Sequence, residues 1–182
     1  MKNVLIPLAP GFEEIETITV VDILRRSGAR VSTAGIVEGI IEGSRGVKLL
    51  ADESINNINS KKFDLIVLHG GQPGTDNLKK DPKVTTLLKE MENKKKLIGA
   101  ICAAPIILEE NGLLRKRKRT SHPSVKVALS GNLYKEDRVV VDQNIITSRS
   151  PGTAMEFAFK LVEILFGNDR VKLVNNGVLA NI

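Results

Sequence analysis

The chain has 182 residues, 42% of them hydrophobic, which suffices for the core of one globular domain and gives no reason to divide it. Pro7 interrupts the apolar N-terminal stretch and two glutamates follow, so we expect no secretory signal, and no apolar run is long enough to cross a membrane. A single cysteine cannot form an internal disulfide, so we expect a cytoplasmic protein.

The formal net charge of +6 raises the question of nucleic-acid binding. The cations gather mainly in residues 93–96, at the end of an expected helix, and in residues 115–119, in an expected loop. Aromatic residues make up only 3% of the chain, which leaves few surfaces on which bases could stack. Nucleic acid is therefore not expected as the main partner.

Short apolar runs alternate with helical periods, which predicts a sheet with crossover helices. Residues 3–8 and 29–36 are expected strands, and residues 13–28 between them an expected helix that ends at Gly28. The apolar face of that helix is expected to hold Ile15, Ile18, Val21 and Leu24.

The second half continues the alternation of strands and helices. Residues 63–71 and 96–101 are expected strands; a helix over 81–96 should open with Asp81 as N-cap and Pro82 behind it. The remaining expected elements are a helix over 102–112, a strand pair over 138–148 with a tight turn at 142–144, and a final long helix over 153–167 that opens with a Thr153–Glu156 capping box. The prediction is one α/β domain over residues 1–182, with a mainly parallel sheet sandwiched by helices.

The ligand crevice of such a sheet lies beyond the carboxyl ends of its strands. Cys102, the only cysteine, stands at one such end, between an expected strand and an expected helix. This is the arrangement of a nucleophile elbow, and the helix N-terminus would lower the pKa of the thiol. The alternative is that Cys102 is a small buried apolar residue.

Three further groups stand near expected strand ends. Gly70 and Gly71 follow the central strand and could expose backbone N–H groups to an oxyanion, or could simply form a turn. Glu16 could turn back over the strand ends and acquire a raised pKa, or could be a solvated helix residue; Glu13 and Glu14 fit an exposed first turn.

The two histidines are the remaining acid–base candidates. His122 lies in a loop-like context before a proline, whereas His69 ends a core strand and could serve only a local hydrogen bond. No spaced His/Cys cluster predicts a metal, and no phosphate loop, dinucleotide fingerprint or serine elbow is present, so no cofactor is expected.

Five motifs follow one another along the chain in a distinctive order: "APGFEEIE" (9–16), "LHGGQPG" (68–74), "AICAAP" (100–105), "TSHP" (120–123) and "TSRSPGTAMEFA" (147–158). In this order they resemble the ThiJ/PfpI superfamily over nearly the whole chain, on the branch of the human Parkinson-disease protein deglycase and its bacterial relatives. The resemblance implies a flavodoxin-like fold similar to class I glutamine amidotransferases, and a homodimer formed through the first helix and its neighbours.

The resemblance also implies roles for individual residues. Cys102 matches the reactive cysteine, and Glu16 matches a usually protonated glutamate that hydrogen-bonds its sulfur. The other matches are Gly70, Gly71 and Ala103 as backbone donors at the pocket, His122 as the nearby histidine, and Arg26 and Arg45 as anion-binding or interface arginines.

Three positions distinguish this chain within the superfamily. His69 replaces a proline of close relatives, and Ser150 replaces a glycine. Both are expected at the pocket edge, and their effect on the pocket is left open. Ala103 stands where the protease-like branch has a histidine, which counts against a peptidase.

The resemblance implies glutathione-independent conversion of small α-oxoaldehydes such as methylglyoxal to hydroxy acids, or removal of their early adducts from protein or nucleotide groups. An alternative is a redox-responsive, chaperone-like stress protein whose Cys102 is oxidised to sulfinic acid. A weaker alternative is a role in thiazole monophosphate biosynthesis, which no phosphate-binding loop supports.

Overall fold

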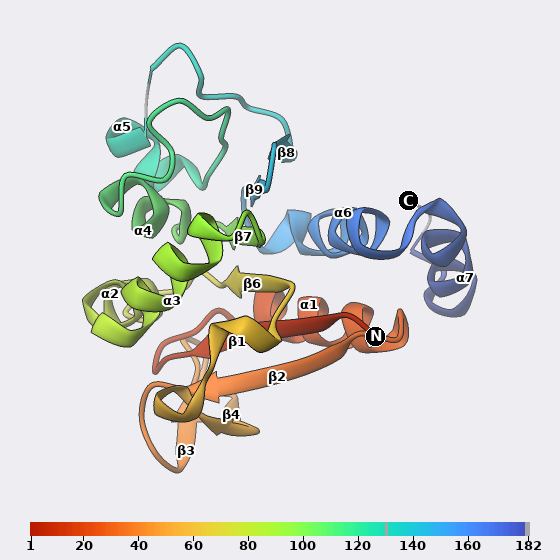
Figure 1. The fold of residues 1–182 in the computed structure, drawn as a ribbon, viewed down its shortest axis with the longest axis horizontal. Helices are drawn as coiled ribbons and strands as arrows, with labels where there is room; N and C mark the ends of the chain where they lie inside the picture. The colour runs from red at the N-terminus through yellow and green to blue at the C-terminus, as the bar shows by residue number, and fades with distance from the viewer. Residues whose placement is uncertain (130, 181–182) are drawn as a thin grey trace.

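A seven-stranded sheet organises the fold (Figure 1). The computed structural model describes residues 1–129 and 131–180. The strand order is β5-β2-β1-β6-β7-β9-β8, and all neighbours are parallel except β8 and β9. The strands are β1 (Asn3–Leu8), β2 (Arg30–Gly35), β5 (Glu53–Ser54), β6 (Leu65–Leu68), β7 (Leu97–Ile101), β8 (Val139–Asp142) and β9 (Ile145–Ser148), and a separate hairpin pairs β3 (Ile40–Glu42) with β4 (Lys48–Leu50).

The parallel part of this sheet has the doubly wound order. Numbered along the chain, β1, β2, β6, β7 and β9 lie in the order 2-1-3-4-5, which is that of flavodoxin-like folds. The expected α/β class and mainly parallel sheet are confirmed. Within the described residues, no helix combines the length and apolar character that a membrane span needs.

Helices cover both faces of the sheet. Figure 1 shows α2, α3 and α4 gathered on one side and α6 and α7 on the other. Each group packs on its own buried apolar cluster, and α1 joins α6 and α7. The helices are α1 (Glu14–Arg26), α2 (Gly74–Lys80), α3 (Pro82–Asn93), α4 (Pro105–Glu110), α5 (Lys126–Leu129), α6 (Ala154–Phe166) and α7 (Asn168–Val178).

The start of α3 follows from its sequence. The carboxylate of Asp81 accepts hydrogen bonds from the N–H groups of Lys83 at 2.8 Å and Val84 at 3.0 Å. Pro82 occupies the first turn, where its missing N–H leaves no hydrogen bond unmade. The expected N-cap is confirmed.

The predicted apolar face of α1 is only partly confirmed. Leu24 is buried and Val21 is half-buried, as expected. Ile15 and Ile18, however, are 57% and 42% exposed, and the helix buries Glu16, Val20 and Ile23 instead. The helix is rotated so that Glu16 turns inward over the strand ends. A stripe of apolar side chains is consequently left on its outer surface.

Two other helix predictions are also corrected. The Thr153 hydroxyl does not cap α6; it donates to the Ser150 carbonyl at 3.0 Å, within a turn that precedes the helix. Glu156 pairs instead with Arg138, at 2.6 Å. The helix over 153–167 is not the last one either, because α7 follows it directly.

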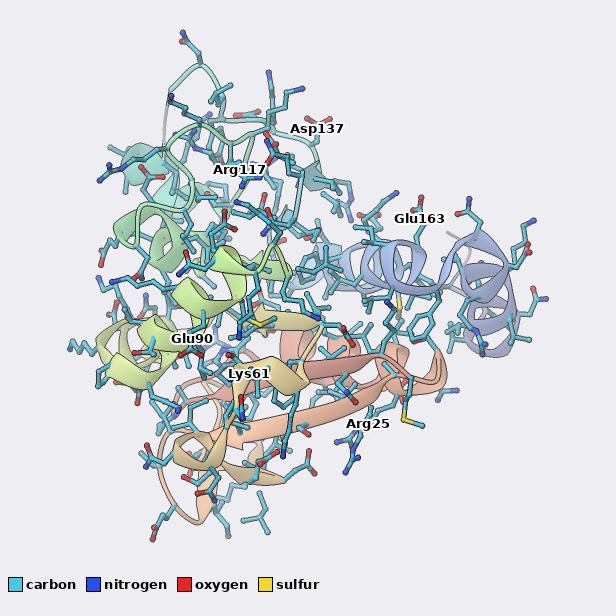
Figure 2. The ribbon with its side chains drawn as sticks, in the orientation of Figure 1. Arg25, Lys61, Glu90, Arg117, Asp137 and Glu163 are labelled. Atoms are coloured by element: carbon cyan, nitrogen blue, oxygen red, sulfur yellow. The ribbon has the colours of Figure 1, made fainter. Side chains whose placement is uncertain are left out.

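The basic cluster 115–119 is only partly a solvated loop. Arg117 and Arg119 are 9% and 7% exposed, while the residues between and before them face solvent. Arg117 contacts the Glu92 carboxylate at 3.1 Å and the Asp142 carbonyl at 3.2 Å, and Arg119 donates to the carbonyls of Leu129 at 3.0 Å and Arg117 at 3.1 Å. Figure 2 shows Arg117 in the part of the molecule that holds α5 and β8. Arg117 therefore fastens the loop to α3 and β8, and Arg119 fastens it to α5.

We expect Arg119→Met to lower the free energy of unfolding by about 2–4 kcal/mol, because it leaves several buried carbonyls without donors while keeping most of the side-chain volume. Urea denaturation followed by circular dichroism measures the change. The exposed Lys116→Met is the matched control and should change stability by less than about 0.5 kcal/mol. Equal effects of the two variants would contradict a structural role for Arg119.

Candidate active site

Three strand ends meet at one edge of the sheet. The loop after β1 leads into α1 and Glu16, β6 is followed by Gly70, and β7 is followed by Cys102. Since these strands are adjacent and parallel, their carboxyl ends bring the three residues together. The expected location of the crevice is thus where the candidate residues gather.

Cys102 lies in a strained turn between β7 and α4. Its φ of 64° falls in the left-handed region, which residues other than glycine seldom occupy. The Cys102 N–H donates to the Ser148 carbonyl at 3.1 Å, and its carbonyl accepts from the His122 N–H at 2.8 Å. These bonds to two different segments hold the turn of a nucleophile elbow.

Glu16 is fully buried beneath that turn. Its Oε2 accepts a hydrogen bond from the Gly70 N–H at 2.8 Å, and the Cys102 thiol lies beside the carboxyl. Burial raises the pKa of Glu16 to about 7, although the hydrogen bonds from Gly70 and Cys102 oppose this rise. Glu16 is therefore not a solvated helix residue, and near neutral pH it exists in both protonation states.

The thiol of Cys102 has a raised pKa, opposite to the sequence-based expectation. Burial is the main cause, and the charge of an ionised Glu16 adds to it; the N–H groups of Gly71 and Ala103 act in the other direction. The helix contributes little because α4 begins only at Pro105 and has six residues. Protonation of Glu16 removes the repelling charge and supplies a donor, so the two groups titrate as a pair.

The glycine pair allows the backbone to approach both groups. A Cβ on Gly70 would lie 2.6 Å from the Cys102 Cβ and 2.8 Å from the Glu16 Oε2. A Cβ on Gly71 would lie 2.5 Å from the Gly11 carbonyl oxygen, and its φ of 89° also favours glycine. The pair is required by close packing and is not an interchangeable turn.

A pocket of about 310 Å³ opens over the sulfur. This is the lower end of the usual size range for small-ligand sites. Of the predicted site residues, Cys102, Gly71, Ala103, His122 and Arg45 line it. Sequence analysis did not select the other lining residues, which are Glu13, Ser44, Gln72, Ser124 and Pro151.

His122 presents its ring at the pocket wall. The Nδ1 atom accepts from the Ser124 N–H at 3.2 Å and lies 2.8 Å from the Ser124 hydroxyl. In the neutral ring this leaves the proton on Nε2. The structure thus brings His122 to the same pocket as Cys102.

His69 and Ser150 were both expected at the pocket edge, but neither lines the pocket. His69 does not line the pocket; it is 2% exposed and lies behind the glycine pair, where its Nδ1 contacts the Gly70 carbonyl at 2.8 Å. Ser150 stands one residue before the lining Pro151, and its N–H donates to the Thr153 hydroxyl at 3.0 Å. Ser150 therefore shapes the turn that carries the edge.

The arginines are separated in the structure. Arg45 lines the pocket from the β3–β4 turn, whereas Arg26 lies at the end of α1, pairs with Asp22 at 2.7 Å and does not reach the pocket. Glu14 holds the β3–β4 turn: it accepts from the Arg45 N–H at 2.5 Å and from the Ser44 hydroxyl at 3.1 Å. The expectation that Glu14 is exposed is wrong, since this anchoring buries it to 8% exposure.

Glu13 joins the site as a residue that sequence analysis had left on the helix surface. Its Oε2 accepts the Glu16 N–H at 2.7 Å, which caps α1, and burial raises its pKa. In residues 1–129 and 131–180, no three His, Cys, Asp or Glu side chains come together as a metal site would require.

The sequence also matches a known protein family. The profile of the DJ-1/PfpI family matches residues 2–164. The chain belongs to the DJ-1/PfpI family. Protein dj-1beta of Drosophila melanogaster is 44% identical over 181 residues, which are 98% of this chain and 97% of the fly protein.

Two other members extend the comparison. Glutathione-independent glyoxalase DJR-1.2 of Caenorhabditis elegans is 39% identical over 172 residues, covering 93% of this chain and 91% of the worm protein. The solved structure of Toxoplasma gondii DJ-1, oxidized, superposes with a TM-score of 0.95 at 36% identity and covers 98% of both chains. The family resemblance seen in the sequence is confirmed.

The raised pKa of Glu16 predicts a pH-dependent stability. A neutral Glu16 favours the folded state fully below its ordinary pKa of 4.5, and this contribution is lost as the pH rises through about 7. Relative to Glu16→Gln, the wild type should therefore lose roughly 3 kcal/mol of unfolding free energy between pH 4 and pH 8. Urea midpoints of both proteins across this range measure the difference, and a difference that does not vary with pH would refute the assignment.

Proposed function

We propose that this chain is a cysteine-dependent enzyme that needs no cofactor and converts small α-oxoaldehydes such as methylglyoxal to hydroxy acids without glutathione. The observation that carries the proposal is the Cys102 thiol beside a buried Glu16 whose pKa is about 7, at the floor of a small pocket. The name of the worm relative, a glutathione-independent glyoxalase, supports the same reaction class.

The first step needs a thiolate. Glu16 in its ionised form accepts the proton of the Cys102 thiol, and the resulting carboxylic acid then donates a hydrogen bond to the sulfur. The thiolate adds to the aldehyde carbon and forms a hemithioacetal, whose oxygen carries the negative charge until it is protonated. The N–H groups of Gly71 and Ala103, which favour negative charge at this place, would stabilise that oxygen.

The second step moves hydrogen between the two oxidised carbons. A base removes the proton from the former aldehyde carbon, and a proton returns to the neighbouring carbon. This converts the hemithioacetal to a thioester of the hydroxy acid. Glu16 is the proposed proton carrier and His122, which lines the same pocket, assists it. Water then hydrolyses the thioester, which releases lactate from methylglyoxal and restores the thiol.

The same chemistry extends to early adducts of these aldehydes. A hemithioacetal or hemiaminal on a protein or nucleotide group keeps the aldehyde carbon at the same oxidation level. Cys102 could therefore attack this carbon either in the aldehyde that the adduct releases or in the adduct itself. The pocket opens to the surface beside Arg45, which is exposed. We therefore include deglycation in the proposed activity.

A redox role is the second candidate. A half-buried thiol beside a carboxyl that can donate a hydrogen bond is suited to stop at sulfinic acid when oxidised. The related Toxoplasma gondii structure is that of an oxidized DJ-1, which supports this alternative. Such a sensor needs the thiolate and one hydrogen bond, but no proton transfer between substrate carbons.

We also propose that the protein forms a homodimer through α1. Ile15, Ile18 and Met155 are 57%, 42% and 37% exposed on the surface formed by α1 and α6. A groove of about 400 Å³ runs along this surface and is lined by Ile18, Met155 and Arg26, among others. Apolar side chains of this size on an outer helix face are typical of protein interfaces.

Purified wild-type protein should convert methylglyoxal to lactate without glutathione, and Cys102→Ser and Glu16→Gln should each lower kcat at least about a hundredfold. Lactate is measured enzymatically at several methylglyoxal concentrations. Lys116→Met, at an exposed site that does not line the pocket, is the control and should keep most of the activity. Should the wild type make no lactate while mild peroxide adds two oxygen atoms to Cys102, the redox role would replace the enzyme.

The dimer is tested by Ile18→Glu, which we expect to shift the protein to a monomer because it places a charge on the apolar surface. Sedimentation velocity over a range of concentrations measures the change. Val127→Glu, at an 88% exposed site on α5, is the control and should leave the dimer intact. A wild type that sediments as a monomer throughout would overturn the proposal.

A further inference from the structure

The peptide unit between Gly70 and Gly71 has both of its polar ends in the site. Its N–H, that of Gly71, favours a negative sulfur on Cys102. Its carbonyl, that of Gly70, accepts two hydrogen bonds, from His69 Nδ1 at 2.8 Å and from the Glu13 N–H at 3.1 Å. Because a peptide unit is planar and rigid, holding the carbonyl also fixes the direction of the N–H.

The contact with the Gly70 carbonyl selects one tautomer of the neutral His69 ring. A carbonyl oxygen only accepts hydrogen bonds, so Nδ1 must carry the ring proton. The ring is 2% exposed and meets the Phe12 ring edge-on, with centroids 6.0 Å apart. Burial outweighs the carbonyls of Gly70 and Pro7 and lowers the pKa of His69 to about 4, which keeps it a neutral donor near neutral pH.

The unit that His69 holds is flanked by glycine on both sides. Glycine has the widest backbone freedom, so no Cβ of its own restricts rotation of this peptide about the neighbouring bonds, and its orientation depends on the groups that contact it. Such a rotation would turn the Gly71 N–H away from Cys102. Donors on the Gly70 carbonyl oppose it, and they also polarise the peptide so that its N–H becomes a stronger donor.

We propose that His69 is a positioning residue: by donating from Nδ1 to the Gly70 carbonyl, it aims and strengthens the Gly71 N–H that stabilises the Cys102 thiolate. His69 does not touch the pocket and takes no part in proton transfer. The expected effect of His69 on turnover rests on the proposed function. Its effect on the pKa of the Cys102 thiol can be measured without any substrate.

The test compares two substitutions that separate the donor from the packing. His69→Asn places an amide N–H at the position of Nδ1 but is smaller than histidine; His69→Leu fills the space better and has no donor. The readout is the rate at which iodoacetamide alkylates the single cysteine between pH 6 and 10, which reports the thiolate fraction.

We expect His69→Leu to raise the apparent thiol pKa by about 0.5–1 unit, which slows alkylation about threefold to tenfold at the lower pH values, while His69→Asn stays within about twofold of wild type. A profile of His69→Leu equal to that of wild type would overturn the proposal. So would equal slowing by both variants, or a larger effect of His69→Asn, since these outcomes follow from packing alone.

Two controls keep the result interpretable. Circular dichroism establishes that each variant is folded; if His69→Leu is not, His69→Gln replaces it, because its longer amide reaches the Nε2 position and offers no donor at Nδ1. Lactate formation is measured in parallel. If wild type makes no lactate but the alkylation profiles separate as expected, the proposed enzyme fails and the positioning role of His69 stands.

Discussion

The site depends on the interaction between a buried carboxyl and the half-buried thiol beside it. The anionic form of each group is disfavoured by its surroundings, since burial raises the pKa of both Glu16 and Cys102. Placed side by side, they make two negative charges more unfavourable than one. The pair therefore favours one anion over two, and backbone N–H groups decide where that charge is held. The Gly70 N–H donates to the carboxyl, whereas those of Gly71 and Ala103 favour charge on the sulfur.

Backbone packing at the end of the sheet makes this arrangement possible. Gly70 lies so close to Cys102 and Glu16 that a methyl group would overlap both, and Gly71 and Gly74 pack equally closely on Gly11 in the loop after β1. The loops after β1 and β6 are thus pressed together without side chains between them. Because the strands are adjacent and parallel, their carboxyl ends lie next to each other, and because glycine has no side chain, the backbones of the two loops can approach closely.

Much of this could be predicted from the sequence because it rests on local patterns. Buried strands such as Leu65–Leu68 are continuous apolar runs, and Asp81 before Pro82 is a strong helix start. The position of Cys102 at a strand end was visible for the same reason. What failed was the placement of Ile15 and Ile18 on α1, because the helical period gives a face but not its direction; the buried Glu16 turns these two residues outward, while Leu24 stays buried.

Contacts between residues that are distant in the sequence could not be predicted from such local patterns. Nothing local distinguishes Glu14 from Glu13, yet one holds a hairpin and the other lines the pocket. The same holds for Arg117 and Arg119, whose partners include groups 10 to 25 residues away in the chain. All five residues of the cluster are cationic, which gave no sign of which side chains are buried, so the sequence could only suggest a solvated loop.

The anchoring of the β3–β4 turn by Glu14 has a consequence for ligand binding. Three donors of the turn, the Ser44 hydroxyl and the N–H groups of Arg45 and Val47, are already bound to this carboxylate, so the wall that carries Arg45 is held in place before any ligand arrives. Binding then requires little ordering of that loop, and less conformational entropy is lost on association. A pocket wall of this kind favours selection by shape: small, compact molecules enter unchanged, and larger ones meet a boundary that does not adapt to them.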